Sequence, residues 1–206
     1  MTFAASHFGT YAVVYVTMEF NDLDGTPWAR KAVEVLAAKG IVQGTAPRTY
    51  SPEAGITRAE YVTLLARTLG LFSGSSGTGT GGPRFTDVQP DDYFFAAVTA
   101  LSEAGILQGY EDETFRPEER IKREELAALT ERALQAAQKP LKSGDASLLD
   151  GYADSADIAA YARGSFTRLI AAGLLTGDQY GLRPAEGATR GEAAVLLHRV
   201  YSGGTE

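Results

Sequence analysis

A segment that occurs three times in phase constrains this chain of 206 residues more than any other feature. The copies read IVQGTAPRTYSPEAGITRAE at 41–60, ILQGYEDETFRPEERIKREE at 106–125 and LLTGDQYGLRPAEGATRGE at 174–192. A glycine precedes each copy and a second lies within it, followed by an aromatic residue or leucine, a proline, and an arginine that opens an apolar-periodic run. Agreement at so many positions indicates a repeat architecture, so the function is expected among the residues that repeat.

The size of the copies determines the expected domain organisation. Each is roughly 50 residues long, which is marginal for an independent hydrophobic core, so we expect one core shared by all three. The boundaries we expect are a strand-like extension at 1–19, the first repeat at 20–71, a Gly/Ser-rich linker at 72–84, the second repeat at 85–138, a second linker at 139–151, the third repeat at 152–201 and a tail at 202–206.

Each copy is predicted to form two helices joined by a loop. In the first copy, Thr26 can cap a helix that begins at Pro27, and Gly40 can end it in the left-handed conformation. The fold class expected is all-α, with three helix–loop–helix repeats sharing one pseudo-three-fold bundle. Helical spacing predicts that the following residues face the core: Ala32, Val35, Leu36, Val62, Leu65, Ala66, Leu69, Phe94, Ala97, Val98, Leu101, Leu126, Leu129, Thr130, Ala133, Ala162, Phe166, Leu169, Ile170, Ala193, Leu196, Leu197 and Val200.

The N-terminal residues 7–20, HFGTYAVVYVTMEF, differ from everything that follows. Their β-branched and aromatic composition predicts a strand. It is either a solitary strand at the edge of this module or the last strand of an upstream β domain.

The repeated arginines Arg58, Arg123 and Arg190 stand in the first turn of the predicted second helices. Thr57 with Glu60, and Thr189 with Glu192, fit a capping box, whereas the second copy has Lys122 with Glu125. The helix dipole disfavours a cation in the first turn. An arginine kept there in every copy therefore needs a partner, which is either a carboxylate inside the protein or an anionic ligand at the helix N-terminus.

An aromatic residue precedes the first glycine of each copy at the same spacing: Trp28, Tyr93 and Tyr161. These rings could pack in the core or serve as platforms for sugars. Trp28 shares a helical stripe with apolar residues, which favours core packing with one edge left to line a groove. Tyr50, Phe115 and Leu182, by contrast, are interpreted as packing residues.

Composition excludes several functions. The net charge of −7 argues against nucleic-acid binding, and the chain has no cysteine for disulfides or thiolate chemistry. No run of 18 apolar residues occurs, so no membrane insertion is expected. No cofactor motif, metal-ligand pattern or catalytic constellation is present, and we expect no enzyme, cofactor or metal.

These features resemble three tandem S-layer homology domains over residues 20–201. The first copy carries the pattern most completely, at Phe20, Leu23, Trp28, Ala29, Gly40, Ile41, Gly44, Tyr50, Pro52, Glu53 and Ile56–Glu60. The second copy has Lys122 in place of threonine. The third departs most, with Tyr152 for phenylalanine, Gly191 for alanine and a loop one residue shorter.

The resemblance implies a module that holds an exported protein on the bacterial cell wall or S-layer. It would do so non-covalently, by binding a pyruvylated secondary cell wall polysaccharide in grooves between repeats. The sequence does not fix the oligomeric state, for which we favour a monomer. Ligand contact is implied for Arg58, Arg123 and Arg190, and we extend it to Thr57, Trp28, Glu60, Lys122, Glu125, Thr189 and Glu192. The Thr57 and Arg58 groove, which keeps the pattern most closely, is expected to bind most strongly.

Two other functions remain open from the sequence. One is a structural module for protein–protein assembly, with the repeated arginines in internal salt bridges. The other is a glycan-processing enzyme with carboxylates on the loops between repeats.

Overall fold

The computed structural model describes residues 17–71 and 85–203, which are mostly helical. Its elements are α1 (Pro27–Ala38), α2 (Arg58–Leu69), α3 (Phe95–Glu103), α4 (Arg123–Ala136), the 3₁₀ turns η1 (Ala146–Leu149) and η2 (Ser155–Asp157), α5 (Ala160–Ala171) and α6 (Arg190–Ser202). No strand occurs within these two ranges, so the all-α class is confirmed for them. Most of the predicted N-terminal strand and the whole linker at 72–84 lie outside the described residues.

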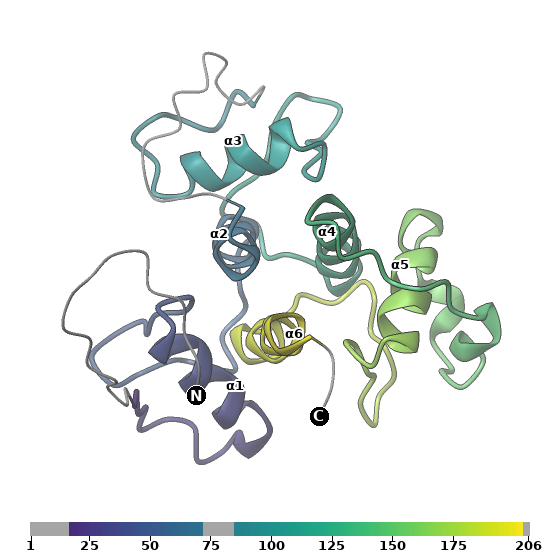
Figure 1. Ribbon diagram of the computed structural model, residues 1–206, viewed down its shortest axis with the longest axis horizontal. Coiled ribbons are helices and arrows are strands. Elements are labelled where there is room, and N and C mark those ends of the chain that lie inside the picture. Colours follow the sequence, from purple (N-terminus) through teal and green to yellow (C-terminus); the bar gives the residue numbers. More distant parts are fainter. Residues whose placement is uncertain (1–16, 72–84, 204–206) are drawn as a thin grey trace, which may run out of the picture.

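The second helices of the three copies, α2, α4 and α6, lie around the centre, and the first helices lie outside them (Figure 1). Each outer helix packs chiefly on the inner helix of the preceding copy: α3 on α2, α5 on α4, and α1 on α6. The first and last helices of the chain are therefore neighbours, and the order of packing closes on itself.

Three loop residues join the copies by backbone hydrogen bonds. Ile121 N donates to Ile56 O (3.1 Å), Ala188 N donates to Ile121 O (2.9 Å), and Ile56 N donates to Ala188 O (3.0 Å). All three side chains are buried, with exposed fractions of 0%, 0% and 1% for Ile56, Ile121 and Ala188. The result is a closed triangle of hydrogen bonds, to which each copy contributes one donor and one acceptor.

The two repeated glycines serve different local needs. Gly40, which follows α1, has φ 69°, the left-handed conformation expected for a residue that ends a helix. Gly44 is instead needed for space, because a Cβ there would lie 2.5 Å from Thr49 O and 3.0 Å from the Phe20 ring.

An aspartate at the start of each copy holds the loop before the second helix. Asp22 accepts from Tyr50 N (2.9 Å) and Ser51 N (2.7 Å), where Ser51 has φ 60°. Asp87 and Asp154 do the same for the paired residues Phe115 and Arg116 and Leu182 and Arg183. These contacts explain why aspartate recurs at this position in all three copies.

The core matches most of the residues predicted for it. All are buried except Val35, Leu69 and Ile170, which are partly buried. The segment 139–151 is more ordered than the predicted linker, because Asp145 caps η1 and Leu149 is 1% exposed against the core.

Candidate functional site

The first backbone N–H groups of α2, α4 and α6, which could have bound an anion, donate instead to carbonyl groups of the protein. In α2, Arg58 N donates to Glu119 O (2.9 Å) and Ala59 N donates to Pro117 O (3.0 Å), both in the loop of the second copy. The first two N–H groups of α4 donate likewise to the loop of the third copy, and those of α6 to the loop of the first. These N–H groups are therefore not free, since inter-copy hydrogen bonds use them.

The predicted capping boxes are present in α2 and α6. Glu60 N donates to the Thr57 hydroxyl (3.2 Å) and Thr57 N donates to Glu60 Oε2 (2.9 Å), and Thr189 with Glu192 has the same geometry. In α4, Lys122 N donates to Glu125 Oε2 (2.9 Å), but the exposed lysine side chain has no acceptor to complete the box.

Each repeated arginine pairs with the first-turn glutamate of the next copy. The pairs are Arg58 Nη1 to Glu125 Oε1 (2.8 Å), Arg123 Nη1 to Glu192 Oε1 (2.7 Å) and Arg190 Nη1 to Glu60 Oε1 (2.9 Å). The arginines are 4%, 8% and 7% exposed in that order. They form a closed cycle of buried ion pairs, in which each glutamate uses one oxygen for its own helix cap and the other for the preceding copy.

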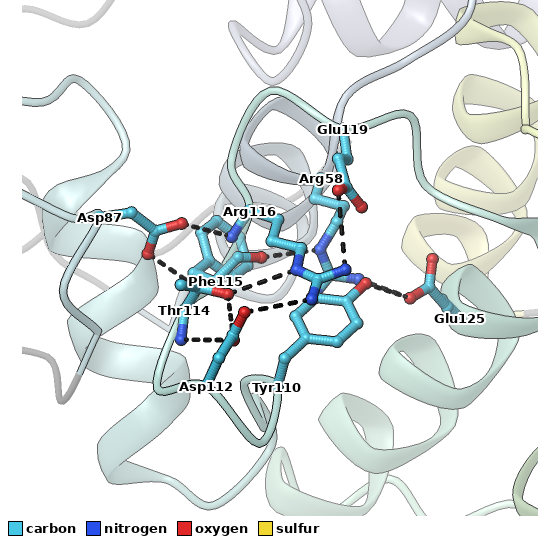
Figure 2. A network of polar contacts seen from close by, with 9 residues as sticks. All are labelled: Arg58, Asp87, Tyr110, Asp112, Thr114, Phe115, Arg116, Glu119 and Glu125. Atoms are coloured by element: carbon cyan, nitrogen blue, oxygen red, sulfur yellow. Dashed lines mark hydrogen bonds and ion pairs between the residues drawn. The ribbon is translucent and has the colours of Figure 1, made fainter.

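Arg58 shows how such an arginine is held (Figure 2). Its Nε donates to Phe115 O (2.9 Å), and Tyr110 donates its hydroxyl hydrogen to the same Glu125 oxygen (3.0 Å). The Tyr110 ring lies 4.9 Å from the Arg58 guanidinium and 3.9 Å from that of Arg116. Burial raises the pKa of the Tyr110 hydroxyl above its usual value, although the Arg58 charge opposes that rise. The phenol therefore stays protonated and able to donate.

The three arginines differ in their remaining donor. Arg190 Nη2 donates to Gln43 O (2.9 Å), so this guanidinium has acceptors for all its nitrogens. For Arg58 and Arg123, no hydrogen bond from Nη2 occurs among residues 17–71 and 85–203. Two of the three arginines thus keep a donor that an anion could use.

The repeated aromatic residues are not in the core. Trp28, Tyr93 and Tyr161 are 51%, 63% and 52% exposed. The preference for core packing of Trp28 is therefore wrong, because the buried face of α1 is centred on Ala29, Val33 and Leu36, one position away from the stripe that contains the tryptophan.

Trp28 lines a groove of about 650 Å³ at the junction of the three copies. Its walls include Trp28 from α1, Arg123 from α4, Glu192 from α6 with the cap residue Thr189, and Tyr180 and Arg183 from the loop of the third copy. We call this the Trp28 groove.

The other two aromatics have equivalent surroundings. Tyr93 lies by Thr57, Glu60 and Arg190, and its pKa is raised by burial and by the Glu60 carboxylate. The pKa of Tyr161 is also raised, by burial and then by the carboxylates of Glu124 and Glu125.

Thr57 and Arg58 belong to different surroundings, contrary to the single groove expected for them. Thr57 stays with the first turn of its own helix, beside Tyr93. Arg58 extends into the second copy, to Glu125 and Tyr110. These two adjacent residues thus contact different parts of the molecule.

Two further properties concern residues 17–71 and 85–203 alone. No helix there is both long and apolar enough to cross a membrane, and no three His, Cys, Asp or Glu side chains there are grouped as a metal site requires.

The S-layer homology domain profile matches this chain three times, at residues 19–62, 84–127 and 151–194. These segments make up more than half of the chain. The chain belongs to the S-layer homology domain family. The match coincides with the three copies whose arginines form the cycle of ion pairs.

Curated relatives of these S-layer homology repeats are much longer proteins. Amylopullulanase of Thermoanaerobacterium thermosulfurigenes is 31% identical over 203 residues, which cover 96% of this chain and 10% of the relative. Surface-layer 125 kDa protein of Lysinibacillus sphaericus is 28% identical over 88% of this chain and 14% of its own length. Cellulosome-anchoring protein of Acetivibrio thermocellus is 32% identical over 58% of this chain and 26% of its own length.

The S-layer homology domain is a cell-wall-anchoring module and not a catalytic one. The enzymatic names among the relatives refer to other parts of those proteins.

Four residues near the repeated arginines and the Trp28 groove were not predicted from the sequence: Tyr110, Arg116, Tyr180 and Arg183. Arg116 and Arg183 precede the repeated proline in the second and third copies, where the first copy has Ser51. That repeated position was a usable signal for the two arginines. The roles of Tyr110 and Tyr180 depend on loop geometry, which no spacing rule provides.

Proposed function

We propose that these S-layer homology repeats anchor the protein that contains them to the outside of the bacterial cell wall. They do so by binding an acidic, pyruvylated secondary cell wall polysaccharide without covalent attachment. The relatives named as a surface-layer protein and a cellulosome-anchoring protein support a role at the cell surface. The residues proposed to contact the glycan are Arg58, Arg123, Arg190, Thr57, Trp28, Glu60, Lys122, Glu125, Thr189 and Glu192.

One observation carries this proposal: a half-exposed aromatic ring and a buried arginine line one groove between copies. In the Trp28 groove, the indole offers an apolar face to a sugar ring, and Arg123 offers a charged donor to a carboxylate. The net charge of −7 gives the chain no general attraction for a polyanion, so local arginines must supply it.

Calorimetric titration with fragments of the pyruvylated polysaccharide tests the proposal, beside the same fragments stripped of pyruvate. We expect binding that needs the pyruvate group. Arg123→Lys should weaken it, because Arg123 lines the Trp28 groove and lysine lacks the planar fork that holds a carboxylate. Arg190→Lys is the matched control and should affect binding less, since Arg190 already has acceptors for all its nitrogens. Binding that is equally tight after removal of pyruvate would contradict the proposal that the module recognises the pyruvate carboxylate.

The cycle of buried ion pairs favours a second candidate function, protein–protein assembly with purely structural arginines. Under that alternative, the polysaccharide gives no heat of binding with the native chain. Sedimentation would then show association between copies or with the S-layer protein of the same cell.

A further inference from the structure

The departures of the third copy from the repeat pattern converge on the Trp28 groove. Gly191 stands where the other copies have Ala59 and Glu124. The shortened loop carries Asp178 and Tyr180, which line the groove together with Arg183, the residue before the repeated proline. Neutral substitutions would not be expected to cluster around one groove of about 650 Å³.

Gly191 makes room for the indole. A Cβ at this position would lie 2.9 Å from Trp28 Cη2 and 3.1 Å from Pro52 O, so an alanine would push the ring outward. The copies that keep a side chain at this position pair it with the smaller ring of a tyrosine, and Tyr161 hydrogen-bonds to Glu124. The third copy therefore allows the larger tryptophan ring to lie close against the helix N-terminus.

Tyr180, in the loop of the third copy, adds a second aromatic ring to the Trp28 groove. It stands in the short turn closed by the Asp178–Gly181 bridge and is 74% exposed. Trp28 is half exposed and lines the same groove, so the groove has two exposed aromatic rings in its lining. Pairs of exposed rings of this kind suit the alternating apolar faces of a saccharide chain.

Arg183 adds a second cation beside Arg123. Its Nη2 donates to Glu192 Oε1 (2.6 Å) and forms an ion pair with Asp178 Oδ2 (2.6 Å), and its Nη1 donates to Glu186 Oε2 (3.0 Å). Its Nε is buried and has no acceptor among the described residues. The equivalent Arg116 instead stacks 3.9 Å from the Tyr110 ring, and the first copy has the uncharged Ser51. Only the third copy thus turns this arginine toward a groove that also holds a tryptophan.

We propose that the Trp28 groove is the main acidic-glycan site of this chain and that Arg183 determines its preference for a carboxylate. This inference rests on the proposed wall-glycan function and adds which groove and which residue select the ligand. The sugar lies between Trp28 and Tyr180, and its carboxylate takes the place of Asp178 on Arg183. Asp178 can leave readily, because its side chain is 41% exposed and such a pair contributes little in water.

The fluorescence of Trp28 tests the inference directly, because the chain contains one tryptophan. Titration with pyruvylated polysaccharide fragments should change its emission with the same Kd that calorimetry gives. Arg183→Ser should weaken binding about tenfold or more, through loss of charge-assisted hydrogen bonds. Asp178→Asn should tighten it, because the competing carboxylate is gone, a gain that a purely structural role for Arg183 does not predict.

The matched control is Arg116→Ser, which changes the same position in the second copy. Serine tolerates the backbone there, since Ser51 has φ 60° where Arg116 and Arg183 have 58° and 51°. Thermal unfolding of each variant checks that it is folded. Binding unchanged by Arg183→Ser, or weakened equally by Arg116→Ser, overturns the inference alone, as does calorimetric binding that leaves Trp28 emission unchanged. No calorimetric binding by the native chain overturns the anchoring proposal and this inference together.

Discussion

At the scale of single residues, the placement of the arginines resolves the conflict with the helix dipole. Each guanidinium extends away from its own helix N-terminus and pairs with the first-turn glutamate in the second helix of the next copy, as Arg58 does with Glu125. That glutamate is favoured by its own helix dipole and is fixed by its cap. The unfavourable position of the arginine is thus offset by a buried, geometrically fixed pair in the next copy.

We expect Arg190→Ala to lower the free energy of unfolding by about 3 kcal/mol, because removing one partner leaves the other charge uncompensated. Arg58→Ala should cost about 1 kcal/mol less, since it lacks the hydrogen bond that Arg190 makes to Gln43 O. Urea unfolding of both variants measures the difference. A smaller loss for Arg190→Ala than for Arg58→Ala would contradict this view of the cycle.

Acid should destabilise the fold through the loop-holding aspartates. Burial pushes the pKa of Asp22 and Asp154 upward, but the backbone N–H groups that donate to these carboxylates outweigh it, so both pKa values lie below normal. A lowered folded-state pKa gives stability that is present above the unfolded pKa, about 3.9, and is lost as the pH falls through the lower folded value. The advantage of the native chain over Asp22→Asn and Asp154→Asn in urea unfolding should therefore shrink as the pH falls below about 4. A constant advantage would exclude these carboxylates as the cause.

At the scale of helices, the caps of the second helices give a prediction with an internal control. Thr57→Ala and Thr189→Ala should each cost about 1 kcal/mol, because each removes the acceptor for a first-turn N–H. Lys122→Ala should cost almost nothing, since Lys122 supplies no such acceptor. Thermal unfolding of the three variants gives the comparison, and an equal loss in all three would show that the cap hydroxyl is not the stabilising group.

Local sequence signals predicted the helices well because the signals are themselves local. Pro27, Gly40 and the caps Thr57 and Thr189 mark helix ends, and apolar spacing identified the buried faces. The cap expected from Thr26 is wrong, because its hydroxyl makes no hydrogen bond to the first turn of α1. The exposure of Trp28 was missed because its stripe and the true core face differ by a single position.

The partner of each helix could not be predicted. The periodicity of α1 gives its apolar face but not whether that face packs on the helix of its own copy or on α6. The same limit applies to the site. The sequence showed that each arginine needs a partner, but the choice of Glu60 for Arg190 depends on contacts between distant parts of the chain.

At the scale of the whole molecule, closure makes the three copies interdependent. The last helix packs on the first, and Arg190 N donates to Ala54 O (2.8 Å) in the first copy. A groove that needs residues from all three copies can keep its geometry only while this closure holds. The proposed binding in this groove therefore depends on the folded, closed arrangement of all three copies.

Hydrogen exchange should reveal this interdependence at the central triangle. The amides of Ile56, Ile121 and Ala188 each donate to a different copy, so none can open for exchange without breaking a link between copies. We expect all three to exchange with the free energy of global unfolding. Arg190→Ala, a change in the third copy, should lower the protection of all three amides by the same amount. If Ile121 kept its protection while Ile56 and Ala188 lost theirs, the copies would open separately, and each groove could then change shape without the others.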